Sequence, residues 1–240
     1  MKKCVLIGGG DIGRGNTSYQ TEIIDKEIVN MTNKKCPVFL FIGLASSHAD
    51  SYYDTIKKIY KNLGCETKYL KKSNLLNNPE IVKDKILSSD IIYIGGGDSI
   101  KLIEKIKEYN INPLLKEAYE KGTILVGISA GAIALSDKGI SDSKIIRKES
   151  DKHILLDGLG YVTINICPHY HKNVSKTDAV KNICQQEQIE IIGLEDNTAL
   201  KIIDGEMNII KNSNENKIYK CRYKKCFIEE EITNQNISKK

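Results

Sequence analysis

The chain has 240 residues, with 36 Lys plus Arg against 31 Asp plus Glu, so its formal net charge is +5. Hydrophobic residues make up 40% and charged residues 28%, an ordinary balance for a folded globular protein that excludes disorder of the whole chain. A charge of +5 spread over this length is far from the clustered basic surface that nucleic-acid binding needs.

Membrane insertion, secretion and metal binding also find little support. No apolar run approaches the roughly 18 residues of a membrane span. The apolar stretch near the N-terminus is cut by Gly8-Gly9-Gly10, too early for a signal peptide. The seven cysteines are irregularly spaced and include no CxxC pair, which argues against a disulfide framework or a zinc site. We therefore expect a cytoplasmic protein with no membrane or nucleic-acid partner, no metal and no cofactor.

Apolar runs alternate with amphipathic segments along most of the chain. Continuously apolar runs predict buried strands at Cys4–Ile7, Val38–Ile42, Asp90–Ile94, Ile124–Ile128, Val162–Cys167 and Glu190–Leu194. Apolar residues at three- and four-residue spacing predict helices at Thr21–Met31, Tyr52–Leu63, Pro79–Leu87, Ser99–Glu108, Pro113–Lys121, Ala130–Ser136 and Lys176–Gln186. This alternation predicts an α/β fold: a mostly parallel, doubly wound sheet with helices on both faces.

The pattern changes after Glu195. Four short segments there predict antiparallel strands: Ala199–Ile203, Met207–Ile210, Lys217–Tyr223 and Cys226–Ile232. Asp204-Gly205 and the polar stretch Asn212–Asn216 are expected to be hairpin turns between them. We predict a single domain over residues 1–232, ending in this antiparallel hairpin extension, and a frayed polar tail over residues 233–240.

The first glycine-rich segment, Gly8–Gly13, fits the G-x-G-x-x-G dinucleotide fingerprint directly after a strand. The fingerprint also needs a carboxylate about 20 residues on, at the end of the second strand, and none stands there. Arg14-Gly15-Asn16 also interrupts the helix that should follow. These departures favour a tight turn at a strand end over nucleotide binding.

Two further motifs point to nucleophilic chemistry. Gly95-Gly96-Gly97-Asp98 lies between a strand and a helix, where backbone N–H groups can bind a phosphate or an oxyanion. Gly127-Ile128-Ser129-Ala130-Gly131 is a G-x-S-x-G sequence in the same strand-to-helix context, the setting of a nucleophile elbow. Ser129 is thus a candidate nucleophile, with the N–H of Ala130 beside the oxyanion; a serine N-cap on a buried helix is the alternative.

A serine nucleophile needs a base, and the chain has four histidines. His169 follows a predicted strand, at the sheet edge where Ser129 should lie, whereas His48 and His153 stand in polar loops. His171 is two residues farther along and less constrained. Glu195 or Asp196, after another strand, could orient the base. The resulting order of serine, histidine and acid differs from that of α/β hydrolases.

In combination, four segments resemble the dipeptidase E and cyanophycinase family of serine peptidases, which has a class I glutamine amidotransferase-like fold. They are Tyr93–Ser99, Gly127–Ala132, Pro168-His169-Tyr170 and Gly193–Leu200, and the resemblance spans about Val5 to Ile210. It implies Ser129 as nucleophile, His169 as general base, and Gly97 and Ala130 as oxyanion donors. Asp196 stands where the cyanophycinase branch has glutamate, so it is the preferred third member of the triad. Glu195 remains an alternative, as does Asp142, because dipeptidase E itself uses an aspartate shortly after the nucleophile helix.

The resemblance implies a serine dipeptidase or exopeptidase that acts on small peptides through an acyl-enzyme, with aspartyl dipeptides as one candidate substrate. A preference for aspartate requires a cation near the site, and Arg14, Arg147 and Lys172 are candidates by location, although the sequence favours a solvated surface charge for each. The polar segment Ser141–Lys152 could line or cover the site. The alternative functions are a non-catalytic amidotransferase-like module that binds a small ligand, and an enzyme that binds a nucleotide at Gly8–Gly13.

Overall fold

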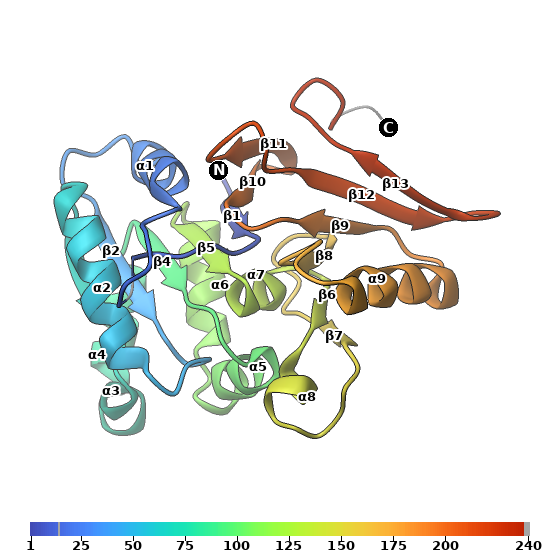
Figure 1. Cartoon of the computed structure of the whole chain (residues 1–240). Helices are drawn as coiled ribbons and strands as arrows, with labels where there is room; N and C mark the ends of the chain where they lie inside the picture. Colours follow the sequence, from blue (N-terminus) through green and yellow to red (C-terminus); the bar gives the residue numbers. More distant parts are fainter. Residues whose placement is uncertain (14, 238–240) are drawn as a thin grey trace.

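The computed structural model describes residues 1–13 and 15–237, and its strands form two sheets (Figure 1). The larger sheet contains β1 (Lys3–Ile7), β2 (Val38–Ile42), β3 (Glu66–Tyr69), β4 (Ile91–Ile94), β5 (Ile124–Ile128), β10 (Thr198–Ile203) and β11 (Glu206–Lys211). Their spatial order is β11-β10-β1-β5-β4-β2-β3. The neighbouring strands β1, β5, β4, β2 and β3 run parallel, and β10 and β11 add an antiparallel hairpin beside β1.

Helices cover both faces of this sheet. Val5 and Ile7 of β1 belong to one core cluster, with α1 (Glu22–Asn30) and α2 (Ala49–Asn62). Cys4 and Leu6 belong to the opposite one, with α4 (Pro79–Leu87), α5 (Ser99–Glu108), α6 (Asn112–Glu120) and α7 (Ala130–Leu135). Successive strand residues point to opposite faces, so a strand covered on both sides is apolar throughout. The short helix α3 (Lys72–Asn77) packs beside α4.

The second sheet follows the nucleophile motif in the chain. It contains β6 (Lys138–Ser141), β7 (Ile154–Asp157), β8 (Asn165–Pro168), β9 (Ile191–Leu194), β12 (Ile218–Tyr223) and β13 (Phe227–Glu231), in the order β13-β12-β9-β8-β6-β7. Helix α8 (Ser143–Ile146) lies between β6 and β7 in the chain, and α9 (Val174–Glu187) packs on β12. Every residue of α7 is buried, and its core cluster also includes Ile166 of β8 and Ile192 of β9, so α7 joins the two sheets.

The predicted α/β class with mostly parallel strands is confirmed, but the prediction of one sheet is wrong. Asp204-Gly205 forms the turn of the β10–β11 hairpin, with φ of 49° and 90° as a primed hairpin turn requires. Asn212–Asn216 is not a hairpin turn, because β11 and β12 lie in different sheets. Sequence reasoning also missed the short strands β3, β6 and β7, which contain the polar residues Lys68, Lys138 and Asp157.

The predicted frayed tail is ordered in its described part. Asn234 accepts a hydrogen bond from the N–H of Ile209 at 2.6 Å, and Ile237 is buried. Residues 238–240 lie outside the described residues. In the described part of the chain, no helix combines the length and apolar character needed to cross a membrane. Five of the seven cysteines are buried as free thiols, whereas Cys36 and Cys226 are exposed.

A buried carboxyl group lies on the face of the large sheet that α1 covers. Asp25 on α1 is 1% exposed and accepts hydrogen bonds from Tyr60 at 2.7 Å, Thr21 at 2.8 Å and Tyr19 at 3.0 Å. Burial raises its pKa to about 6, although the three hydrogen bonds oppose the rise. The folded state therefore retains this proton at a pH where the unfolded chain has released it.

We predict that Asp25 makes the folded state less stable as the pH rises from 4 to 7. Its folded pKa lies above the unfolded value of 3.8, so the folded state binds more protons in this interval. Relative to an Asp25→Asn variant, the native chain should lose about 2 kcal/mol of unfolding free energy between pH 4 and pH 7, measured by urea denaturation. Asp54→Asn, at an exposed position of α2, is the control and should leave this slope unchanged. Parallel pH profiles for Asp25→Asn and the native chain would contradict the prediction.

Candidate active site

Ser129 lies on the sharp turn between β5 and α7, as the sequence predicts. Its backbone has φ 53° and ψ −111°, a sparsely populated conformation for a residue with a side chain. Its N–H donates to Ile7 O at 3.0 Å, and its carbonyl accepts from Ile133 N at 3.0 Å. A Cβ on Gly127 would lie 2.3 Å from Gly131, so the glycines are needed where strand and helix cross. Neighbouring elements thus hold the turn in the strained conformation that exposes a nucleophile.

His169 and Asp196 reach Ser129 from the second sheet. His169 directly follows β8, and its Nε2 lies 2.9 Å from Ser129 Oγ. Its Nδ1 lies 2.5 Å from Oδ1 of Asp196, which follows β9. An ionised carboxylate only accepts hydrogen bonds, so Nδ1 carries the hydrogen and Nε2 is free to accept the serine proton. The three side chains therefore meet where the two sheets adjoin.

The environment of Asp196 keeps its carboxylate ionised. Burial raises the pKa of this group, but the hydrogen bond and charge of His169, with the charges of Lys172 and Lys176, outweigh burial and lower the pKa below its ordinary value. A negative charge beside Nδ1 stabilises the imidazolium that forms when Nε2 takes up a proton.

The two alternative acids lie elsewhere. Glu195 Oε1 contacts His171 Nδ1 at 3.2 Å, and its Oε2 accepts the Lys217 N–H at 2.8 Å. Asp142 directly precedes α8, where its charge acts on His153. In the described structure it is Asp196, rather than either alternative, that contacts His169.

The glycine-rich turn after β4 forms the opposite wall of the site. Gly97 has φ 139°, and a Cβ there would lie 2.5 Å from Ala45 O. A Cβ on Gly96 would lie 3.4 Å from Ser129 Cβ, so this backbone runs directly past the serine. Gly96, Gly97, Ser129, His169 and Asp196 are among the residues that line a cavity of about 300 Å³. Ala130 is the first residue of α7, where an N–H has no intrahelical acceptor.

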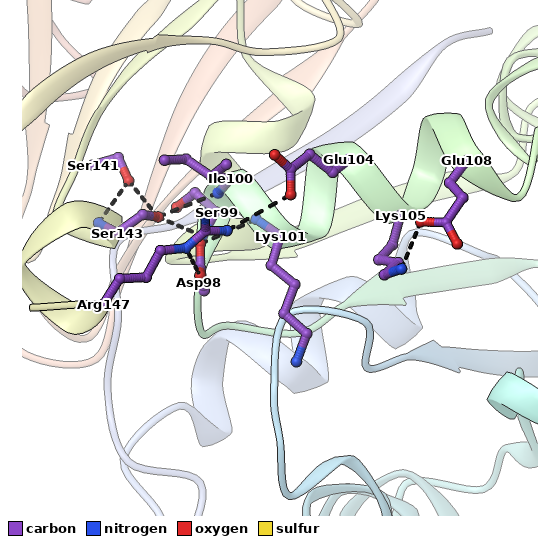
Figure 2. A network of polar contacts seen from close by, with 10 residues as sticks. All are labelled: Asp98, Ser99, Ile100, Lys101, Glu104, Lys105, Glu108, Ser141, Ser143 and Arg147. Atoms are coloured by element: carbon purple, nitrogen blue, oxygen red, sulfur yellow. Dashed lines mark hydrogen bonds and ion pairs between the residues drawn. The ribbon is translucent and has the colours of Figure 1, made fainter. Parts of the chain in front are cut away.

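A polar network anchors the helix that follows this turn (Figure 2). Asp98 Oδ1 accepts the Lys101 N–H at 3.0 Å, and its Oδ2 lies 2.5 Å from Arg147 Nε. Ser143 Oγ accepts the N–H groups of Ser99 at 2.9 Å and Ile100 at 3.2 Å. The segment containing α8, which sequence reasoning treated as a loop over the site, thus fixes the N-terminus of α5. Its role was missed because a polar segment carries no sequence signal for the contacts it makes.

The three basic residues that were candidates for binding a substrate carboxylate have different surroundings. Arg147 forms ion pairs with Asp98 and, at 3.7 Å, with Glu104, so its charge is engaged within the protein. Lys172 lines the 300 Å³ cavity, with its Nζ 3.9 Å from Asp196 Oδ2. Arg14 lies outside the described residues.

The first glycine-rich segment supports the His169–Asp196 pair. A Cβ on Gly9 would lie 2.1 Å from Asp196 Oδ1 and 2.4 Å from His169 Nδ1. The Gly8 carbonyl accepts the His169 N–H at 3.1 Å. Helix α1 begins only at Glu22, so no described helix N-terminus follows the motif directly, as a dinucleotide site requires. The segment is a tight turn at a strand end, packed against the site.

An α/β fold with a serine on a strand-to-helix turn, in contact with a histidine that a carboxylate holds, is the arrangement of serine hydrolases. The model of peptidase family S51 matches residues 4–210. The chain belongs to this family and is a serine-type peptidase.

Relatives agree with this assignment. The chain is 28% identical over 171 residues to the uncharacterized peptidase YgaJ of Bacillus subtilis, covering 71% of this chain and 69% of that protein. It is 23% identical over 222 residues to a Peptidase E of Nostoc, covering 88% and 86%. The crystal structure of a peptidase from an acI-B1 actinobacterium superposes with a TM-score of 0.71 at 21% identity, covering 97% of this chain and 94% of that one, and shows the same fold.

We predict that Gly9→Ala lowers kcat for peptide hydrolysis about 100-fold, because the added methyl group displaces the His169–Asp196 pair and small misplacements at a reacting centre are costly. The backbone of Gly9 does not have positive φ, so alanine can adopt its conformation. Circular dichroism and the unfolding midpoint should therefore stay close to those of the native chain. Native activity in this variant would show that the site does not depend on the close approach.

Proposed function

We propose that the chain hydrolyses small peptides through an acyl-enzyme, with Ser129 as nucleophile, His169 as general base and Asp196 as the group that orients the imidazole. The observation that carries this proposal is the unbroken contact from Asp196 to His169, at 2.5 Å, and from His169 to Ser129, at 2.9 Å. Each contact lies within the distance that proton transfer requires.

In the first half of the proposed reaction, Ser129 Oγ attacks the peptide carbonyl while His169 Nε2 takes its proton. The N–H groups of Gly97 and Ala130 hold the tetrahedral oxyanion, each stabilising the transition state by about 3 kcal/mol. The imidazolium, paired with Asp196, then protonates the leaving amine as the C–N bond breaks. In the second half, His169 activates a water that attacks the ester, and Ser129 is released.

The dimensions of the site favour a short substrate. A cavity of about 300 Å³ is at the lower end for ligand sites and accommodates one or two residues around the scissile bond. Lys172, on the wall of this cavity, is the described residue best placed to meet a substrate carboxylate. We propose dipeptides as substrates, with aspartyl dipeptides the first to test.

The proposal includes the organisation and location of the protein. Both sheets supply residues to the site, which supports one functional domain over residues 1–232. The exposed free thiols of Cys36 and Cys226 suit a reducing compartment, which supports action in the cytoplasm.

We predict that Ser129→Ala lowers kcat/KM by at least about 10⁴-fold, because the nucleophile is lost while the fold is kept. The measurement is hydrolysis of a dipeptide library by the purified native chain and the variant, which also reports side-chain preference. Ser175→Ala, at an exposed position, is the matched control and should retain native activity. Native turnover by Ser129→Ala would refute the assignment, and a native chain that cleaves no peptide would favour a binding protein.

A further inference from the structure

A second, larger cavity adjoins the candidate active site. Its volume is about 650 Å³, roughly twice that of the cavity around Ser129, and Ser46 lines both. Its walls come from the β2–α2 connection, the segment between β3 and α3, and α5. The two cavities therefore adjoin at Ser46, where one extended ligand can contact both.

The larger cavity is lined by an excess of positive charge. Lys71, Lys72, Lys101 and Lys105 contribute to its wall, against one acidic residue, Asp50. Lys105 forms an ion pair with Glu108 at 2.5 Å. Within the described chain, Lys71, Lys72 and Lys101 have no carboxylate partner within 4 Å. Figure 2 shows the Lys101 side chain extending from α5 away from the Asp98 network, and no dashed line joins its end to another of the residues drawn.

Two observations define what such a cavity accepts. Burial, followed by the charges of Lys71 and Lys68, lowers the pKa of the nearby Lys85, so Lys71 adds to the positive potential beside the cavity. Leu44, Tyr69 and Tyr109 also line the cavity, so a ligand meets apolar surface as well as ammonium groups. A peptide segment with apolar side-chain groups and a carboxylate matches both, whereas a small inorganic anion matches only the lysines.

We propose that this cavity binds a remote, carboxylate-bearing residue of peptides longer than a dipeptide, whose scissile bond lies at Ser129. The proposal rests on the proposed peptidase function and adds a second point of recognition. Ser46 lies at the junction, so the peptide runs past the Gly97 turn into the lysine-lined cavity. Selectivity for acidic peptides then arises at a residue remote from the reacting carbonyl and is absent for dipeptides.

The test measures binding without turnover. Ser129→Ala protein is titrated by calorimetry, in low salt, with the tetrapeptide amides Ala-Ala-Ala-Glu and Ala-Ala-Ala-Gln and with the reversed pair Glu-Ala-Ala-Ala and Gln-Ala-Ala-Ala. In one of the two pairs, the glutamate peptide should bind about tenfold more tightly than its glutamine counterpart, which is the gain that two exposed ion pairs can give. Added salt should weaken this preference because it screens the charges. In the Ser129→Ala background, the further substitutions Lys72→Gln and Lys101→Gln should abolish the preference for the glutamate peptide. The control pair, Lys83→Gln with Lys107→Gln, lies on α4 and α5 outside this cavity and should leave the preference unchanged.

Equal affinity for glutamate and glutamine peptides in both pairs would overturn the proposal, as would a preference that survives the Lys72 and Lys101 substitutions. Sodium phosphate that displaces the glutamate peptide at equal concentration would also overturn it, because the cavity would then be a simple anion site. Dipeptide hydrolysis by the native chain, measured separately, reports the proposed function. Its failure is thus distinguishable from the failure of this inference.

Discussion

The site depends on the contact between the turn after β1 and the residues that follow β8 and β9. The Gly8 carbonyl accepts the N–H of His169, and the Gly9 carbonyl accepts the N–H of Asn197 at 2.9 Å. These two backbone bonds join the two sheets without a side chain in the turn. The N–H of Gly8 donates to Thr198 O of β10 at 2.9 Å, which continues the pairing of β1 with β10 within the large sheet. Because the β1 turn comes so close, a side chain at position 9 would displace the His169–Asp196 pair, which lies directly over it.

Helix α7 adds the second constraint at this seam. It is entirely buried and packs against strands of both sheets, so the position of Ser129 is set by the core rather than by a surface loop. Its short Ala- and Gly-rich sequence permits the close approach; a Cβ on Gly131 would lie 2.1 Å from Ile94 O. Core packing therefore holds Ser129 at its positive φ, and the proposed chemistry requires this rigidity.

Much of this arrangement could be predicted from the sequence. The buried strands were predictable because a strand covered on both faces must be apolar at every position, and Gly127–Gly131 revealed the strand-to-helix turn. The division into two sheets was not, because periodicity shows which residues are buried but not which strands pair. Strand β3 lies at a sheet edge and begins with three consecutive polar residues, so its sequence signal is weak. The sequence likewise does not show which of two adjacent acidic residues contacts a histidine. The conformation of the turn after β9 places Asp196 against His169 and Glu195 against His171.

Reactivity of Ser129 toward a fluorophosphonate tests the central claim most directly, since the probe phosphonylates a serine that a neighbouring base activates, with loss of fluoride. After incubation, intact-mass measurement and peptide mapping should locate a single adduct on Ser129. Labelling should be lost in His169→Ala and strongly reduced in Asp196→Asn, while Glu195→Gln should label like the native chain. An adduct at another residue, or labelling of Ser129 that is undiminished without His169, would contradict the triad.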